Sequence, residues 1–171
     1  MFTIGDLIIY SGHGICKVDD ICNKTIAGTT RAYYVLHPID NNHGLTISTP
    51  VENKKNVISK LINQDEAREI IDSFHSKGID WIEKTQLRIQ TYTNIIKSGN
   101  RIDIAKVANT LIRKKHEIEL EGKKFYESDV KLLTSIETIL FKELAISLNK
   151  PTAVIHDKIE EILLTTTRDY A

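Results

Sequence analysis

The period of the hydrophobic pattern changes once along this chain, near residue 62. Up to that point, short apolar runs and partial alternation are separated by Gly, Pro and Asn residues, which is typical of β-strands and their turns. Beyond it, apolar residues recur at the spacing of amphipathic helices. This change predicts an α+β fold in which residues 1–62 form a β domain and residues 63–171 form a helical domain.

Short strands are predicted in the first part, over residues 7–10, 15–22, 31–37 and 45–49. Turns are expected at 11–14, 23–30 and 40–44. Pro38 ends the strand over 31–37 and Pro50 ends the strand over 45–49, because proline has no backbone N–H to donate to a sheet. Four or five strands at this spacing are typical of a small antiparallel barrel, here a Tudor-like one. We expect Cys16 and Cys22 to pack in or near its sheet.

About five amphipathic helices are predicted in the second part, packed into a compact domain. Asn63 and Glu66 have the spacing of a capping box that opens a helix through about His75. The other expected caps or starts are Asp80, Asp103, Ser128 and Pro151, and the expected ends are Gly99, about Gly122 and about Leu164. Because Trp81 directly follows Asp80, it is expected at a helix start, where its side chain can project from the domain.

The composition excludes several classes of protein. With 41% hydrophobic residues in 171, the chain can bury a core and is not a disordered protein. No apolar run approaches the roughly 20 residues that a membrane span needs, and the N-terminal residues lack the basic region and cleavage site of a signal peptide. Two cysteines suit a reducing compartment. We therefore expect a cytoplasmic protein.

The sequence offers no constellation for catalysis. The histidines are scattered, and none lies at a usual metal-ligand spacing from another: they are His13, His37, His43, His75, His116 and His156. Hydrolase, P-loop, dinucleotide-binding and zinc-protease motifs are missing from the sequence. We expect a protein that is not an enzyme and that needs no metal and no cofactor.

One stretch, residues 77–115, is strongly basic in a chain whose net charge is zero. It carries nine Lys or Arg residues against three Asp or Glu residues, and it contains the only tryptophan, Trp81. A cationic surface beside a large flat ring is what a nucleic-acid backbone and an unstacked base require. A solvated helix pair around a core tryptophan is the other interpretation of the same residues.

Two sets of motifs resemble the CarD/CdnL family of bacterial transcription regulators. In the first part they are Phe2-x-x-Gly5-Asp6-x-x-x-Tyr10-x-x-His13-Gly14, Ile26-x-Gly28, Tyr33-Tyr34-Val35-Leu36 and Pro50-x-x-Asn53. In the second part they are Trp81, Lys97-Ser98-Gly99, Ala105-Lys106-Val107-Ala108-x-x-Leu111-x-Arg113 and Glu143-Leu144-Ala145. The likeness covers nearly the whole chain.

The resemblance implies a β domain that binds the β subunit of RNA polymerase and a helical domain that contacts promoter DNA. It implies that Trp81 wedges into the minor groove at the upstream edge of the melted bubble and stabilises the open complex. Such a protein is cytoplasmic and reaches the nucleoid through RNA polymerase. The residues expected at DNA are Trp81, Lys84, Arg88, Lys97, Arg101, Lys106, Arg113 and Lys114. Those expected at RNA polymerase are Lys24, Ile47 and Ser48.

The sequence departs from the family pattern at several of these positions. Glu83 and Lys84 stand where many relatives have two arginines, so one phosphate contact is lost and one acid is added. Ser48 stands where some relatives have arginine. A second hypothesis, of another class, is a protein-binding adaptor in which the β half holds polymerase and the helical half holds a second protein without contacting DNA. Salt dependence separates the two, because phosphate contacts release counterions.

Overall fold

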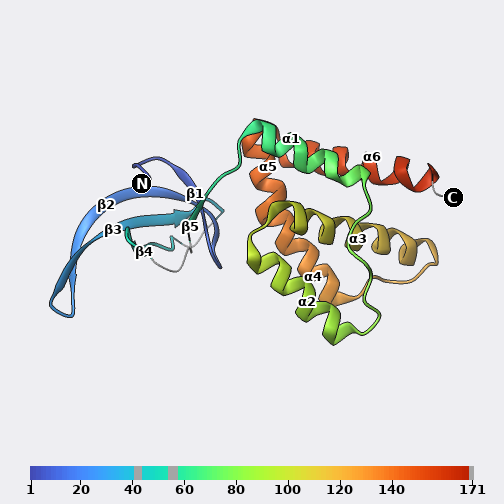
Figure 1. Cartoon of the computed structure of the whole chain (residues 1–171), viewed down its shortest axis with the longest axis horizontal. Helices are drawn as coiled ribbons and strands as arrows, with labels where there is room; N and C mark the ends of the chain where they lie inside the picture. Colours follow the sequence, from blue (N-terminus) through green and yellow to red (C-terminus); the bar gives the residue numbers. More distant parts are fainter. Residues whose placement is uncertain (41–43, 54–57, 170–171) are drawn as a thin grey trace. The chain divides into compact units, whose positions relative to one another are not determined.

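A computed structural model describes residues 1–40, 44–53 and 58–169 of the chain. It contains two compact units, Met1–Leu61 and Ile62–Ala171, each of which is described by itself (Figure 1). Residues 41–43, at the centre of the turn expected at 40–44, lie outside the described residues. Strands occupy the first unit and helices the second, so the predicted α+β class is confirmed.

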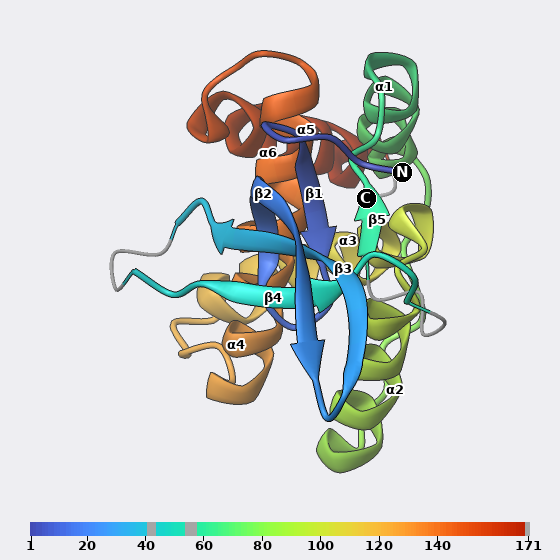
Figure 2. The same cartoon turned by 90° about the vertical axis from the view of Figure 1, so that its left-hand side faces the viewer.

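In the described part of the first unit, five antiparallel strands form one sheet in the order β4-β3-β2-β1-β5 (Figure 2). They are β1 (Leu7–Tyr10), β2 (Gly14–Ile26), β3 (Thr29–Pro38), β4 (Ile47–Pro50) and β5 (Ile58–Lys60). Within these residues β4 and β5 are the two edges and do not pair, so the sheet is not closed. Its strands and order are compatible with the barrel-like Tudor fold.

The hairpin of β2 and β3 is longer than the sequence predicts. The loop expected over 23–30 is a turn at Ala27 and Gly28, and the strands continue on both sides of it. Both turn residues have positive φ, 51° and 78°, as a tight hairpin turn of matching twist requires. Alanine seldom adopts this conformation, so the Ala-Gly pair did not indicate so short a turn.

A small core lies on one side of the sheet. Its buried members are Ile8, Cys16, Val18, Tyr34 and Leu36. Burial raises the pKa of the Cys16 thiol to about 11, so the group stays protonated and unreactive at neutral pH. Cys22 is also part of β2, which confirms that both cysteines lie in the sheet.

The second unit is a helical bundle with a continuous apolar core. Its elements are α1 (Gln64–Asp72), the 3-10 turn η1 (Ser73–His75), α2 (Thr85–Ser98), α3 (Arg101–Leu120), α4 (Glu127–Ile136), the π-helical turn η2 (Glu137–Phe141), α5 (Lys142–Ser147) and α6 (Thr152–Asp169). Because α4, η2 and α5 follow one another without a break, these described elements amount to the five helices expected. None of them is long and apolar enough to cross a membrane.

Local end signals located some helix boundaries correctly. Asn63 accepts a hydrogen bond from the amide of Glu66 at 2.9 Å, and the Glu66 carboxylate accepts one from the amide of Asn63 at 2.8 Å, which confirms the capping box. Gly99 ends α2 in the left-handed conformation, at φ 75°.

Three expected helix starts are wrong. The cap of α3 is Asn100, whose side chain accepts from the amide of Asp103 at 3.1 Å, so Asp103 lies inside the first turn. The helix α4 starts before Ser128, at Glu127. The largest difference is at α2, which begins at Thr85, so Asp80 caps nothing.

Candidate functional site

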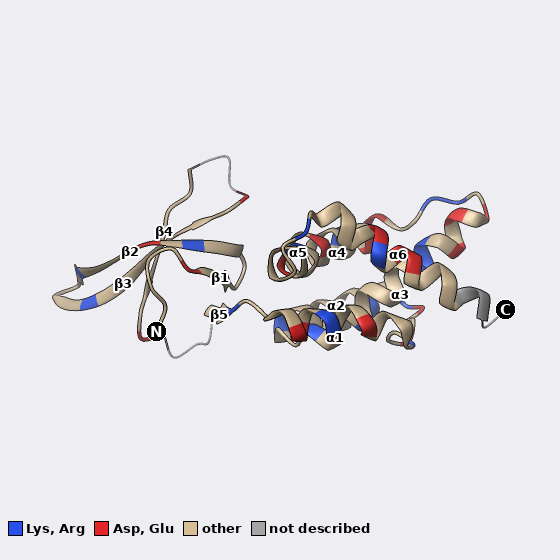
Figure 3. Cartoon of the chain, turned by 90° about the horizontal axis from the view of Figure 1, so that it is seen from above, with Lys and Arg blue, Asp and Glu red and all other residues tan. Residues whose placement is uncertain are grey.

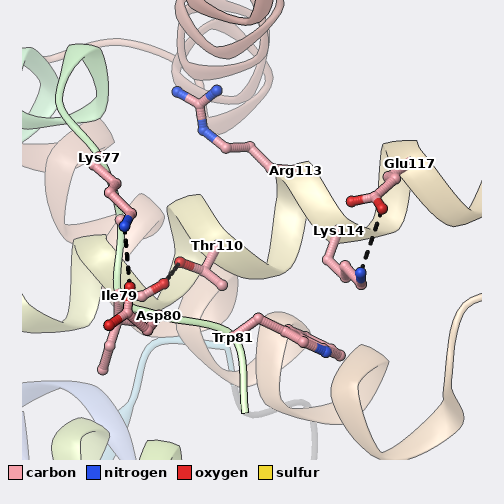
Figure 4. Close-up of a pocket in the computed structure, with 9 residues that line it drawn as sticks. Lys77, Ile79, Asp80, Trp81, Thr110, Arg113, Lys114 and Glu117 are labelled. Carbon is pink, nitrogen blue, oxygen red and sulfur yellow. Dashed lines mark hydrogen bonds and ion pairs between the residues drawn. The ribbon is translucent and has the colours of Figure 1, made fainter. Parts of the chain in front are cut away.

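Trp81 lies in an extended segment, residues 76–84, which we call the strap. The strap connects η1 to α2 and runs along α3, where Trp81, Lys77 and Asp80 line one cleft (Figure 4). The position of Trp81 directly after Asp80 predicted a helix start. That prediction is wrong, because Trp81 lies before α2, in the strap. It is partly buried and packs against the core of the second unit.

Polar side chains of α3 hold the first half of the strap. The Asn109 amide donates to the carbonyl of Ser76 at 2.9 Å, and the Thr110 hydroxyl donates to the carbonyl of Ile79. The amide of Ile79 in turn donates to the carbonyl of Lys106 at 3.3 Å. Asn109 and Thr110 are buried, although both are polar, because the backbone of the strap supplies their partners.

The next residue of the strap is held from α2. Burial raises the pKa of the Tyr92 phenol above its ordinary value, so the hydroxyl stays protonated. It donates to the carbonyl of Asp80 at 2.8 Å. The residue directly before Trp81 is thus fixed by a buried tyrosine.

Arg88 of α2 holds the second half of the strap from inside the unit. Its side chain is 1% exposed and makes a two-pronged ion pair with Asp129 of α4, through Nε at 2.9 Å and Nη2 at 2.7 Å. Nη1 donates to the carbonyls of Ile82 at 2.8 Å and Glu83 at 3.3 Å. A buried arginine thus ties α2, α4 and the strap together.

Cations and a second aromatic ring surround the indole of Trp81. The guanidinium carbon of Arg88 lies 4.1 Å from the ring centroid, and Lys114 Nζ lies 5.3 Å from it. The ring of Tyr126 stacks nearly parallel at 24°, with 6.4 Å between centroids. Cations over an indole face are attracted by its quadrupole, which keeps the ring in place.

Trp81 borders an open cleft of about 540 Å³ (Figure 4). Lys77, Arg113 and Lys114 line it, together with Asp80 and Glu117. In Figure 4, Lys114 lies beside the indole, whereas Arg113 extends away from it. The Nε of Arg113 donates to the Oδ1 of Asn109 at 2.6 Å, so this arginine supports a residue that holds the strap.

The basic surface is weaker than the count of cations suggests. Lys77 pairs with Asp80 at 3.1 Å, Lys106 with Asp103 at 4.0 Å, and Lys114 with Glu117 at 3.4 Å. Figure 3 likewise shows Lys and Arg interspersed with Asp and Glu over the helices. The pairs of Lys77 and Lys106 are exposed and therefore weak, so these two lysines can exchange their acidic partners for phosphates.

Two of the residues expected at DNA are bound inside the unit. Arg88 is buried, so its place does not fit a phosphate contact. Arg101 pairs with Glu143, a side chain that is 1% exposed, with 3.1 Å between Nη2 and Oε1. Lys97 is exposed at the end of α2, roughly 20 Å along that helix from Lys84.

In the first unit, the residues expected at RNA polymerase lie together. The ammonium of Lys24 on β2 donates to the hydroxyl of Ser48 on β4 at 2.6 Å. Ile47, next to Ser48, packs its side chain against the small core. Lys24 and Ser48 thus meet near the β4 edge of the sheet, whereas the side chain of Ile47 is directed at the core.

Sequence reasoning missed the residues that support Trp81. Asp129 is 41 positions from Arg88, and no local pattern connects two such residues. The stacking of Tyr126 on Trp81 likewise had no sequence signal. Asn109 and Thr110 had one: they are the two polar residues in the buried stretch of α3 from Val107 to Ile112.

In the described residues, no group of His, Cys, Asp and Glu side chains is arranged to hold a metal ion.

Models of known protein families match both parts of the chain. Residues 2–62 match the family model of the CarD-like/TRCF RID domain, and residues 69–160 match that of the CarD C-terminal domain. CarD proteins are non-catalytic transcription regulators that interact with RNA polymerase. The chain therefore belongs to the CarD-like family of transcription regulators.

Proposed function

We propose that this chain bridges the β subunit of RNA polymerase and promoter DNA, and that it stabilises the open complex. The first unit binds polymerase and the second binds DNA. The observation that supports this assignment best is the setting of Trp81, a partly exposed indole that is clamped on a strap beside several lysines.

A clamped indole suits insertion at the edge of melted DNA. An inserted flat side chain replaces part of the lost base stacking, which is worth about 1–3 kcal/mol per base. Because Trp81 is already held by Arg88 and Tyr126, inserting it costs little additional side-chain entropy. Insertion of this kind requires a fixed indole.

The surrounding cations contact phosphate and do not read the sequence. Lys77, Lys84, Lys106 and Lys114 lie on the strap, at its end or on the adjoining α3. Backbone contacts of this kind position a protein without specifying bases. Lys97 and Arg113 lie farther from the indole and make outlying contacts, whereas Arg88 and Arg101 support the fold.

In the first unit, Lys24, Ile47 and Ser48 supply the surface for polymerase. Ile47 and Ser48 lie on the edge strand β4, and such strands bind partners by extending the sheet. Lys24 reaches Ser48 from β2. Lys24 adds a charge whose present partner, the Ser48 hydroxyl, is neutral. An acidic side chain of the polymerase is the partner that this surface favours.

Site-specific photocrosslinking tests both assignments in one promoter complex. A photoreactive phenylalanine analogue at position 81 should crosslink to DNA at the upstream edge of the bubble, and one at position 48 should crosslink to the β subunit. The matched control is position 164 on α6, an exposed leucine, which should crosslink to neither. Crosslinks from position 81 only to protein would favour an adaptor that holds a second protein and makes no DNA contact.

A further inference from the structure

We infer that Arg88, fixed by Asp129, is a positioning residue that sets the ring of Trp81 for insertion. This inference rests on the proposed function. It assigns to a buried ion pair a role in DNA engagement that neither residue can have by contact, because their side chains are 1% and 0% exposed.

The hydrogen bonds of Arg88 leave its guanidinium no freedom to turn. An arginine has five N–H donors in one plane. Here they meet both oxygens of Asp129, the carbonyls of Ile82 and Glu83, and the hydroxyl of Thr85 at 3.5 Å. With every donor engaged, the plane of the guanidinium is fixed relative to the bundle.

That fixed group supports the aromatic pair. Its central carbon lies 4.1 Å from the centroid of the Trp81 ring and 5.5 Å from that of Tyr126. The two carbonyls that it binds belong to the residues directly after Trp81, so the backbone and the ring are held by one side chain. Loss of Arg88 therefore removes both the cation that contacts the indole and the donor that holds the backbone next to it.

Stability alone gives little reason for such a pair. Replacing a buried ion pair by apolar residues of similar volume is often neutral or stabilising, whereas removing one partner is strongly destabilising. A variant that replaces both partners together can therefore separate the effect of Arg88 on the position of Trp81 from its effect on folding. The double change Arg88→Met/Asp129→Leu removes both charges together and leaves no unpaired charge in the core.

The experiment follows Trp81 directly, because it is the only tryptophan in the chain. In the double variant we expect retained cooperative melting, but greater acrylamide quenching of Trp81 and lower fluorescence anisotropy. The fraction of chains with a displaced indole should rise by roughly tenfold, since a desolvated cation–π contact contributes on that scale. Open-complex lifetime per polymerase-bound molecule should fall toward that of Trp81→Ala.

The matched control is Arg68→Met, which removes an arginine that is 61% exposed and paired with Asp65 on α1. It should change neither quenching nor lifetime. A folded double variant with wild-type quenching and wild-type lifetime would overturn the inference and leave Arg88 as a structural residue only.

A second variant covers the case in which the double variant does not fold. Arg88→Lys keeps one charge for Asp129 but loses the planar fork. It should still increase quenching, and unchanged quenching in a folded Arg88→Lys chain would also overturn the inference. Because quenching needs no DNA, it tests the positioning even if Trp81→Ala proves to have no effect on open complexes.

Discussion

At Gly78 the strap passes close against α3. A Cβ atom at this position would lie 2.5 Å from the Thr110 hydroxyl, 2.8 Å from the carbonyl oxygen of Lys106 and 3.0 Å from the amide nitrogen of Thr110. The Thr110 hydroxyl and the Lys106 carbonyl are the groups that hold Ile79. Even one methyl group would therefore push the strap off the helix that anchors it.

We predict that Gly78→Ala destabilises the chain by about 1–3 kcal/mol, the usual cost of an overpacked contact. Urea unfolding followed by Trp81 fluorescence measures this free energy. The control is Lys77→Ala, at a neighbouring side chain that is 85% exposed, which should change the free energy of unfolding by less than about 0.5 kcal/mol. Equal effects of the two changes would mean that the strap is not tightly packed on α3.

The helix start expected at Asp80 shows how contacts from residues distant in the sequence can override a local capping pattern. Asp80 and Glu83 have capping-box spacing, but the carbonyls of Asp80 and Ile82 are taken by the side chains of Tyr92 and Arg88. These long-range bonds favour an extended strap over another helical turn. The partner that fixes Arg88 lies 41 residues away, beyond the reach of any periodicity argument.

At the scale of elements, α3 connects the strap to the rest of the bundle. Its first residue, Arg101, pairs with Glu143 of α5, and the same carboxylate accepts a hydrogen bond from the amide of Ile62 at 2.9 Å. Glu143 therefore joins α3, α5 and the first residue of the second unit. The sequence analysis expected Arg101 among the DNA contacts, and we propose that this partner gives it a structural role instead.

Arg101→Met should lower the free energy of unfolding by about 2–3 kcal/mol, somewhat less than for a fully buried pair, because Arg101 is 22% exposed. Chemical denaturation measures the loss. The dependence of DNA affinity on salt should stay as in the wild type, since no phosphate contact is removed. If Arg101→Met keeps full stability but shows a weaker dependence of DNA affinity on salt, Arg101 contacts DNA.

The strap and α3 also make a joint prediction about DNA. Reversing Lys77 and Lys106 to glutamate should weaken binding to all sequences alike and reduce the slope of log affinity against log salt by about two. Folding should persist, because both residues make only exposed ion pairs. Fluorescence anisotropy titrations with labelled duplexes over a range of salt give the slope.

The control for this charge reversal is Lys158→Glu on α6, which should leave the slope unchanged. If Lys158→Glu lowers the slope as much as the strap and α3 changes do, the effect reflects net charge and not a defined surface. Losses confined to particular DNA sequences would indicate base readout instead.

Helix ends set by neighbouring residues could be predicted, whereas those set by distant ones could not. Asn63 and Gly99 act within one turn of their helices, and both were located correctly. The start of α3 was assigned three residues late because Asp103 was chosen over Asn100, although the two lie on either side of the same amide hydrogen bond. Strand lengths were underestimated for a similar reason, since β2 and β3 extend each other by pairing.

On the scale of the whole molecule, the two proposed binding functions belong to two separate units. The cluster of Lys24 and Ser48 belongs to the first unit and the Trp81 site to the second. Each site is built from residues of its own unit. Damage to one should therefore leave the other intact.

Lys24→Glu should weaken capture of the polymerase β subunit by the full chain, because it reverses the charge beside Ser48 of the edge strand β4. Affinity for promoter DNA without polymerase, and its salt dependence, should not change. Pull-down with the β subunit and DNA titration of the same preparation measure both. Lys17→Glu, elsewhere on β2, is the control that should capture polymerase normally, and a loss with both variants would indicate a general charge effect.

The most direct test of the central claim is the lifetime of open promoter complexes with Trp81→Ala, measured at saturating polymerase-bound protein. Trp81 is only partly buried, so the variant should lose less than the roughly 3–5 kcal/mol of a full core truncation and should still bind polymerase. The account predicts a shortened lifetime per bound molecule. A wild-type lifetime, or a shortened one explained entirely by unfolded protein, would contradict it.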